Sequence, residues 1–102
     1  MIWVYNCGMI SFAKDFKETE KEFEIFANKN RLAILSFLNK NKKGSVGQIA
    51  DHLEISFKTA SRHLLYLAKK GILKRHYDGP FVLYEISDNL SKLARLVISH
   101  LP

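Results

Sequence analysis

Apolar residues in the first 40 positions of the chain recur at the spacing of an α-helix. In a first segment the apolar side chains fall on one side and the charged residues on the other, and in a second segment they cover more than half of the circumference. We expect one helix that ends at Ala27 and a second over residues 29–39, with Asn28 as its N-cap. Residues 39–44 contain no apolar side chain and are expected to form a solvated loop. The stripe of the first helix consists of Phe12, Phe16, Phe23, Phe26 and Ala27.

Two further helices are predicted with a very short connection between them. Ser45 and Gln48 have the spacing of a capping box, in which each side chain binds a backbone amide at the start of a helix, here Val46–Leu53. Ser56 is another preferred N-cap, and the apolar spacing after it predicts a helix that ends at Gly71. Because so few residues separate the two helices, they must cross steeply, as in a helix-turn-helix.

After the fourth helix the apolar period becomes alternating. Residues 72–77 and 81–86 have the pattern of two strands, and Asp-Gly-Pro at 78–80 predicts the turn of a β-hairpin. Ser87 or Asp88 is expected to cap a last helix that runs to the chain's end. A hairpin directly after a helix-turn-helix is a winged helix. The predicted fold is therefore mainly α with a β-hairpin, in the order α-α-α-α-β-β-α.

The length of 102 residues fits one domain, 1–102. Residues 1–13 are apolar, but they lack a basic leader and are too short to span a bilayer. Either this extension packs on the domain or on a partner subunit, or Met9 is the natural start. We expect residues 14–27 and 88–101 to be dimerisation helices, 46–70 the helix-turn-helix and 72–86 the wing.

The positive charge is concentrated in the middle of the chain. The formal net charge is +6, and residues 41–76 hold eight basic and two acidic side chains. Because this segment spans the helix-turn-helix and the first wing strand, the charge indicates a surface that faces double-stranded DNA.

The fourth helix supplies the candidate base contacts. Arg62 is expected to read bases, since arginine binds guanine through two hydrogen bonds. Phe57 either contacts a thymine methyl group or packs on its own domain, and His63 either contacts DNA or is a half-buried packing residue. The other candidates are expected to contact phosphates, or phosphates and bases, and the wing is expected to contact the DNA backbone. They are Lys42, Lys43, Ser45, Ser56, Lys58, Thr59, Ser61, Lys74, Arg75 and His76.

These motifs resemble the ArsR family of winged-helix transcriptional repressors. The resemblance covers residues 20–86 and is carried by 27–35, 45–53, 55–56, 59–67 and 70–73, with the Ser61-Arg62-His63-Leu64 stretch its most specific part. It implies a homodimer, built from the first and last helices, that binds an inverted repeat in a promoter and dissociates when an effector arrives.

The apolar pattern favours a dimer independently of the resemblance. Apolar stripes on both terminal helices exceed what so small a core can hide, and exposed stripes usually mark interfaces. Two-fold symmetry would set the recognition helices about 34 Å apart, one turn of DNA. The expected interface residues are Phe12, Phe16, Phe23, Leu90, Leu93, Ala94, Val97 and Leu101.

The resemblance does not extend to the family's metal sites. Ser45 and Gly47 stand where many relatives have a Cys-x-Cys pair, and Leu90 stands where another group has a histidine. We therefore expect no metal and no cofactor. The single cysteine, Cys7, excludes an intrachain disulfide, favours a cytoplasmic location and is expected to be inert. Glu54 replaces the usual glycine or asparagine of the turn, at a small backbone cost.

The sequence also bears on enzyme, membrane and protein-binding functions. No catalytic constellation or glycine-rich phosphate loop is present, so an enzyme is not expected, and no membrane association is expected. The alternative to a DNA-binding regulator is a winged-helix module that binds a partner protein through Phe57 and the wing. A third possibility is a redox or ligand sensor on the same DNA-binding frame.

Overall fold

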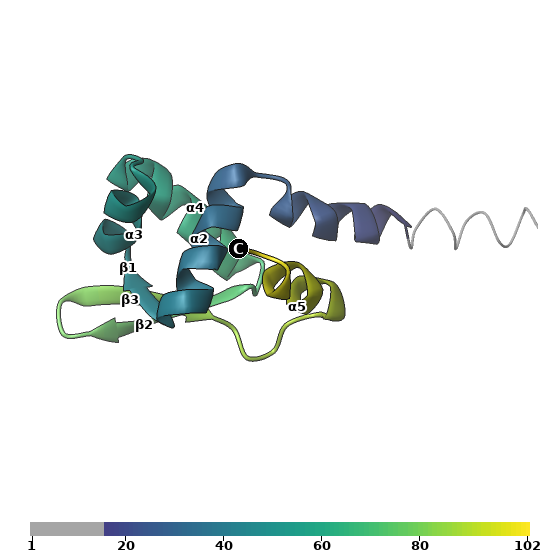
Figure 1. Ribbon diagram of the computed structural model, residues 1–102. Helices are drawn as coiled ribbons and strands as arrows, with labels where there is room; N and C mark the ends of the chain where they lie inside the picture. Colours follow the sequence, from purple (N-terminus) through teal and green to yellow (C-terminus); the bar gives the residue numbers. More distant parts are fainter. Residues whose placement is uncertain (1–15) are drawn as a thin grey trace, which may run out of the picture.

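The computed structural model describes residues 16–102 and has the fold of a winged helix-turn-helix (Figure 1). Helices α2, α3 and α4 stand above a small sheet, and its hairpin projects past α3 to one side, while α5 and the first helix lie at the opposite side. The elements are a helix over residues 16–26, α2 (Lys29–Asn41), β1 (Lys43–Ser45), α3 (Val46–Leu53), α4 (Phe57–Lys69), β2 (Leu73–Asp78), β3 (Phe81–Ile86) and α5 (Lys92–Ser99).

The predicted N-caps of α2, α3 and α4, which are Asn28, Ser45 and Ser56, are confirmed. The Asn28 Oδ1 accepts the backbone N–H groups of Asn30 and Arg31 at 2.9 and 3.1 Å. Ser45 and Gln48 form both bonds of the capping box, at 2.9 and 3.2 Å. These local bonds satisfy amides that have no partner within their helices, and so fix where α2 and α3 begin.

The segment before α3 is a strand, and the expectation of a loop over residues 39–44 is wrong there. Helix α2 continues to Asn41, and β1 then pairs antiparallel with β3 in a sheet of order β1-β3-β2. Gly44 lies opposite Tyr84, and a Cβ at this position would be 2.9 Å from a ring carbon of Phe37. Because only a glycine fits this close approach, the segment lacks the alternating apolar side chains that predict a strand from sequence.

The last helix also begins later than expected. Its N-cap is Ser91, whose Oγ accepts the Ala94 N–H at 3.1 Å, rather than Ser87 or Asp88. The Ser87 N–H donates to the Ile72 carbonyl at 2.9 Å, which keeps this residue on the sheet. Asp88 binds a lysine of β2 instead of a helix start. Leu90 and Leu101 therefore lie outside α5.

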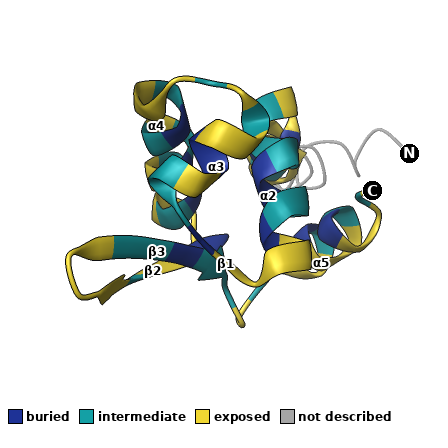
Figure 2. Cartoon of the chain, turned by 60° about the vertical axis from the view of Figure 1, so that its left-hand side comes forward, coloured by how far each residue is buried: buried dark blue, intermediate teal, exposed yellow. Residues whose placement is uncertain are grey.

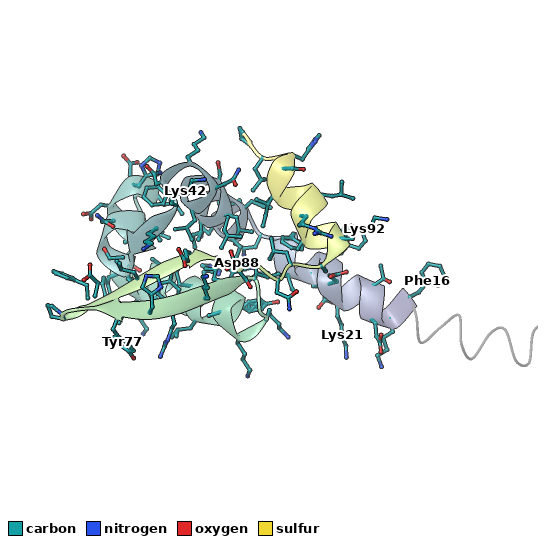
Figure 3. The ribbon with its side chains drawn as sticks, turned by 90° about the horizontal axis from the view of Figure 1, so that it is seen from below. Phe16, Lys21, Lys42, Tyr77, Asp88 and Lys92 are labelled. Carbon is teal, nitrogen blue, oxygen red and sulfur yellow. The ribbon has the colours of Figure 1, made fainter. Side chains whose placement is uncertain are left out.

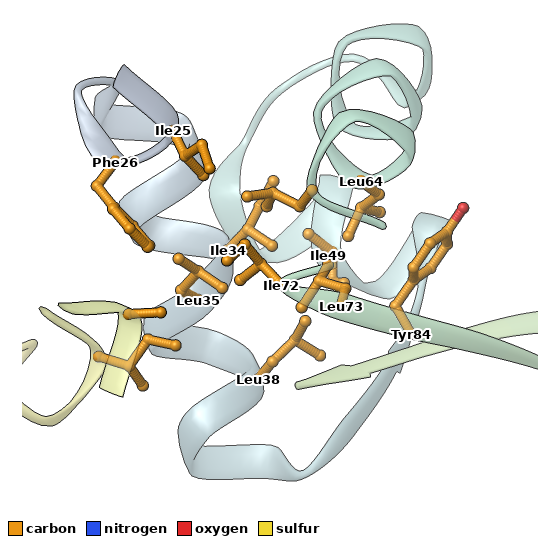
Figure 4. Packing of buried hydrophobic residues seen from close by; sticks show 13 residues of the cluster. Ile25, Phe26, Ile34, Leu35, Leu38, Ile49, Leu64, Ile72, Leu73 and Tyr84 are labelled. Atoms are coloured by element: carbon orange, nitrogen blue, oxygen red, sulfur yellow. The ribbon is translucent and has the colours of Figure 1, made fainter. Parts of the chain in front are cut away.

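One apolar core joins all the helices with the sheet (Figure 4). The helix over residues 16–26 contributes Ile25 and Phe26, whereas Phe16, Phe23 and Ala27 of its predicted stripe are exposed. Among residues 16–26, the core thus receives side chains from the last turn of this helix, and the exposed Phe16 and Phe23 stay on the surface, where the dimer interface is predicted. The buried residues of this core cluster are Ile25, Phe26, Ile34, Leu35, Leu38, Ile49, Leu64, Leu67, Ile72, Leu73, Tyr84, Ala94 and Ile98.

The turn between α3 and α4 contains a residue in the left-handed region. Glu54 has φ 57° and ψ 43°, and its N–H and that of Ile55 donate to carbonyls of the last turn of α3. This conformation costs about 1–2 kcal/mol for a residue with a Cβ. We expect Glu54→Gly to raise the free energy of unfolding by about 0.5 kcal/mol, because glycine loses part of this gain through the entropy of the unfolded chain. Urea denaturation measures the change, and Glu54→Ala, which keeps the Cβ, should bring no gain.

Candidate nucleic-acid interface

The N-terminal end of α4 presents an exposed group of one aromatic and two cationic side chains. Phe57 is 63% exposed, and Lys58 and Arg62 are also exposed. Neither Lys58 nor Arg62 forms an ion pair with any of residues 16–102. The sequence predicted these three as DNA contacts, and the exposure of Phe57 leaves its ring available to a thymine methyl group. We call Phe57, Lys58 and Arg62 the reading edge.

The hydroxyl groups at the same end of α4 are used within the cap. The Ser56 Oγ accepts the Thr59 N–H at 3.0 Å and donates to the Thr59 Oγ1 at 2.8 Å. Thr59 and Ser61 are half-buried. A phosphate contact by the Ser56 hydroxyl would therefore compete with its bond to Thr59, whereas the Thr59 hydroxyl accepts in that bond and keeps its own hydrogen for a phosphate.

His63 is half-buried on α4, next to the reading edge. Its burial lowers the pKa of the imidazole, and the positive charges of Arg31 and Arg62 lower that pKa further. The neutral form is favoured, since a protonated ring would lose hydration and face two cations. The neutral imidazole keeps one N–H donor, so its partial burial fits the packing role, and a DNA contact through that N–H stays a prediction.

The passage from α2 through β1 to α3 brings further basic groups. Lys42 is exposed at the end of α2, with φ 72° (Figure 3). Lys43 is exposed at the start of β1. The Ser45 Oγ accepts a bond in the capping box, so its hydroxyl hydrogen and the positive helix dipole remain for an anion at the start of α3.

The base of the wing carries less free positive charge than the sequence suggested. The Nζ of Lys74 lies 3.1 Å from Glu85 and 2.8 Å from Asp88, and these hydrogen bonds, first to Asp88 and then to Glu85, raise the pKa of Lys74. Its charge is compensated by two carboxylates. Arg75 is exposed opposite Tyr84 and His76 is half-buried opposite Leu83.

The tip of the wing is aromatic, a feature that the sequence reasoning did not single out. Tyr77 is 69% exposed and Phe81 is 61% exposed, on the two strands beside the turn. Figure 2 shows exposed residues gathered on the outer turns of α3 and α4 and at this tip. The signal was available in the sequence, since both aromatic residues flank a predicted hairpin turn and therefore stand beyond the core.

The expected dimer residues occupy different environments. Phe16 and Phe23 are 55% and 53% exposed, and Phe12 lies outside the described residues. Ala94 is completely buried in the protomer's own core, so naming it as an interface residue was wrong. Leu96 of α5, which lies outside the predicted stripe, is 62% exposed and offers apolar surface instead. The remaining expected residues are half-buried: Leu90, Leu93, Val97 and Leu101.

The described residues contain neither a metal-binding cluster nor a membrane-spanning helix. Within residues 16–102, no three histidine, cysteine, aspartate or glutamate side chains are grouped so that they could hold a metal ion. In the same part of the chain, no helix has the length and apolar character needed to cross a membrane. Cys7, with its expected inertness, lies outside the described residues.

Comparison with known proteins agrees with this geometry. The model of the bacterial regulatory protein arsR family matches residues 28–75. An HTH-type transcriptional regulator of Methanocaldococcus jannaschii is 32% identical over 83 residues, which are 80% of this chain and 93% of that protein. The cadmium resistance transcriptional regulatory protein CadC of Listeria innocua is 36% identical over 66 residues, which are 65% of this chain and 56% of CadC.

A solved structure shows the same arrangement. Reduced HlyU from Vibrio cholerae is 28% identical, with a TM-score of 0.72 over 87% of this chain and 90% of that chain. HlyU is described as a transcriptional activator. The predicted winged fold is thereby confirmed. The family model and the relatives are transcriptional regulators and not enzymes, and they identify the chain as a member of the ArsR family of DNA-binding transcriptional regulators.

Proposed function

We propose that the protein is a dimeric, sequence-specific repressor that binds an inverted repeat in a promoter through α4. The observation that carries the proposal is the reading edge, in which Phe57 and two cations without an ion pair among residues 16–102 stand exposed at the start of a helix that fits the major groove. Arg62 is assigned to base reading. Lys58 and the basic residues before α3 are assigned to phosphates, which position the protein without specifying sequence.

The dimer is proposed from apolar surface at the far side of the domain. Phe23 on the first helix and Leu96 on α5 each expose more than half of their surface. Other apolar residues of the same two helices are buried in the core. Covering such side chains with a second copy removes them from water, which contributes about 25 cal/mol per Å² of apolar area. A closed pair with two-fold symmetry would present two α4 helices to successive major grooves.

Repression is proposed because it requires no contact other than occupancy of the promoter. A dimer bound across a promoter excludes polymerase by volume alone. Transcription in vitro from a promoter that holds the selected sequence tests this point. Reduced transcript with added protein supports repression, and increased transcript would make the protein an activator, as HlyU is described to be.

Selection of bound sequences from a random DNA pool tests the function as a whole. We expect an inverted repeat whose half-sites are about 10 base pairs apart. Enrichment of a single unrepeated site would contradict the dimeric arrangement, and no enrichment would contradict sequence-specific binding. The exposed Phe57, Tyr77 and Phe81 would then favour a protein partner, whose binding should respond little to salt.

The salt dependence distinguishes the free lysines from the paired one. Each phosphate contact that is lost lowers the slope of log K against log salt by about 1. We expect Lys42→Gln to lower this slope for every DNA sequence alike, because Lys42 has no ion pair among the described residues. Lys74→Gln should change it less, since Glu85 and Asp88 already compensate the charge of Lys74. Equal changes in the two variants, measured by fluorescence anisotropy, would contradict this assignment.

A further inference from the structure

Arg31, near the start of α2, binds the end of the preceding helix. Its Nε donates to the Ile25 carbonyl at 2.7 Å, and its Nη2 donates to the Glu24 carbonyl at 2.9 Å. The last carbonyls of a helix have no partners within the helix, and a positive charge there is favoured by the helix dipole. One planar guanidinium thus holds the C-terminal end of the helix over residues 16–26.

The same guanidinium lies on a side chain of α4. The Cζ of Arg31 is 4.3 Å from the centre of the Tyr66 ring, which also has the Nζ of Lys70 at 5.6 Å. A cation over an aromatic face is attracted by the electron density of the ring. Tyr66 follows Arg62 by four residues, so it lies one helical turn beyond the reading edge on the same rigid helix.

The position of His63 gives further evidence that these groups lie close together. His63 is half-buried on α4 between Arg62 and Tyr66 in sequence, and the positive charge of Arg31 is one cause of its lowered pKa. Arg31 therefore acts electrostatically on the turn of α4 that follows the reading edge, in addition to its contact with Tyr66.

We propose that Arg31 is a positioning residue for DNA binding, which fixes the direction of α4 relative to the helix over residues 16–26. The inference rests on the proposed function, in which that helix packs against a second copy and α4 enters the major groove. Through Arg31, the position of the second copy on the first helix and the orientation of the reading edge on α4 then depend on each other. Lysine does not replace it, because an ammonium lacks the planar fork that bonds two carbonyls while stacking on a ring.

Substitutions in both partners test the link through operator affinity. We expect Arg31→Lys and Tyr66→Leu each to weaken binding of the selected operator by about 2- to 30-fold, the usual size of such couplings. Tyr66→Phe keeps the ring and should keep the affinity. Ile34→Val is the matched control, since it removes a buried methylene one turn along α2 and leaves the Arg31 contacts in place. All variants are compared at a temperature where circular dichroism shows them folded.

A distance measurement tests the orientation without DNA. Spin labels are attached through Glu20→Cys and Lys69→Cys, both exposed, in a Cys7→Ser background, and the labelled chain is diluted with unlabelled protein. We expect a narrow distribution of distances between the labels with Arg31 and with the Ile34→Val control. Arg31→Lys should broaden or shift the distribution.

The outcomes separate this inference from the proposed function. Weaker operator binding together with a changed label distance supports it. Unchanged affinity in Arg31→Lys and Tyr66→Leu overturns it, and so does weaker binding with an unchanged distance, because Arg31 would then act by touching DNA itself. If the wild-type protein selects no DNA sequence, the proposed function fails, and an unchanged label distance in Arg31→Lys would overturn the orienting role separately.

Discussion

Arg62→Ala is expected to remove about 1–3 kcal/mol of specific binding to the selected operator, which is about a 5- to 150-fold loss of affinity. Arg62 is exposed on α4, forms no ion pair with another described residue, and carries the one guanidinium of the reading edge. A guanidinium can donate two parallel hydrogen bonds to a guanine, and alanine leaves those acceptors without partners. Fluorescence anisotropy with operator and with random DNA measures the change.

Two matched variants distinguish a base contact from a phosphate contact. Arg62→Lys keeps the charge and loses the fork, so it should lose specificity almost as fully as alanine while it retains binding to random DNA. Lys58→Ala removes a neighbouring charge and should weaken both DNAs alike. If Arg62→Ala weakened operator and random DNA by the same factor, Arg62 would be a phosphate contact, and base reading would have to be assigned elsewhere.

Phe23→Glu is expected to dissociate the proposed dimer and to weaken operator binding by about 100-fold or more. The ring of Phe23 is 53% exposed, and a carboxylate in its place would lose hydration if a second copy covered it. With the link between two half-sites broken, each α4 binds alone, and the gain of about 10²–10⁴ from effective concentration is lost. Sedimentation equilibrium reports the mass, and anisotropy reports the affinity.

The control for this variant carries the same change in charge on the same helix. Lys21→Gln also makes the protein more negative by one unit, but Lys21 offers an exposed charged group rather than a ring (Figure 3). It should leave the dimer intact. A Phe23→Glu protein that kept both its mass and its affinity would place the interface on another surface.

The parts of the fold that were predicted correctly are those fixed by local bonds. Asn28, Ser45 and Ser56 each cap a helix through their own side chains. Each cap and the backbone amide that it binds are only two or three residues apart in the sequence. The hairpin could also be predicted from the sequence, because alternating side chains flank an Asp-Gly-Pro turn. Glu54 adopts the left-handed conformation that its place in the turn required. None of these features needs knowledge of the tertiary packing.

The parts that were missed depend on contacts between distant segments. Strand β1 exists because β3 lies beside it, and three residues containing a glycine have no pattern of their own. The start of α5 moved to Ser91 because Ser87 and Asp88 are held by the sheet. The role of Arg31 was not visible either, although an arginine shortly after a helix end is a signal that could be sought.

The strand order β1-β3-β2 also determines which backbone groups remain open to other molecules. The two outer strands are β1, which has only three residues, and β2, which carries Lys74, Arg75 and His76 in succession. A short edge strand and a charged edge strand both discourage a strand of another molecule from adding to the sheet. The two edges of this sheet are thus poor templates for an added strand, which protects the protein against polymerisation through its wing.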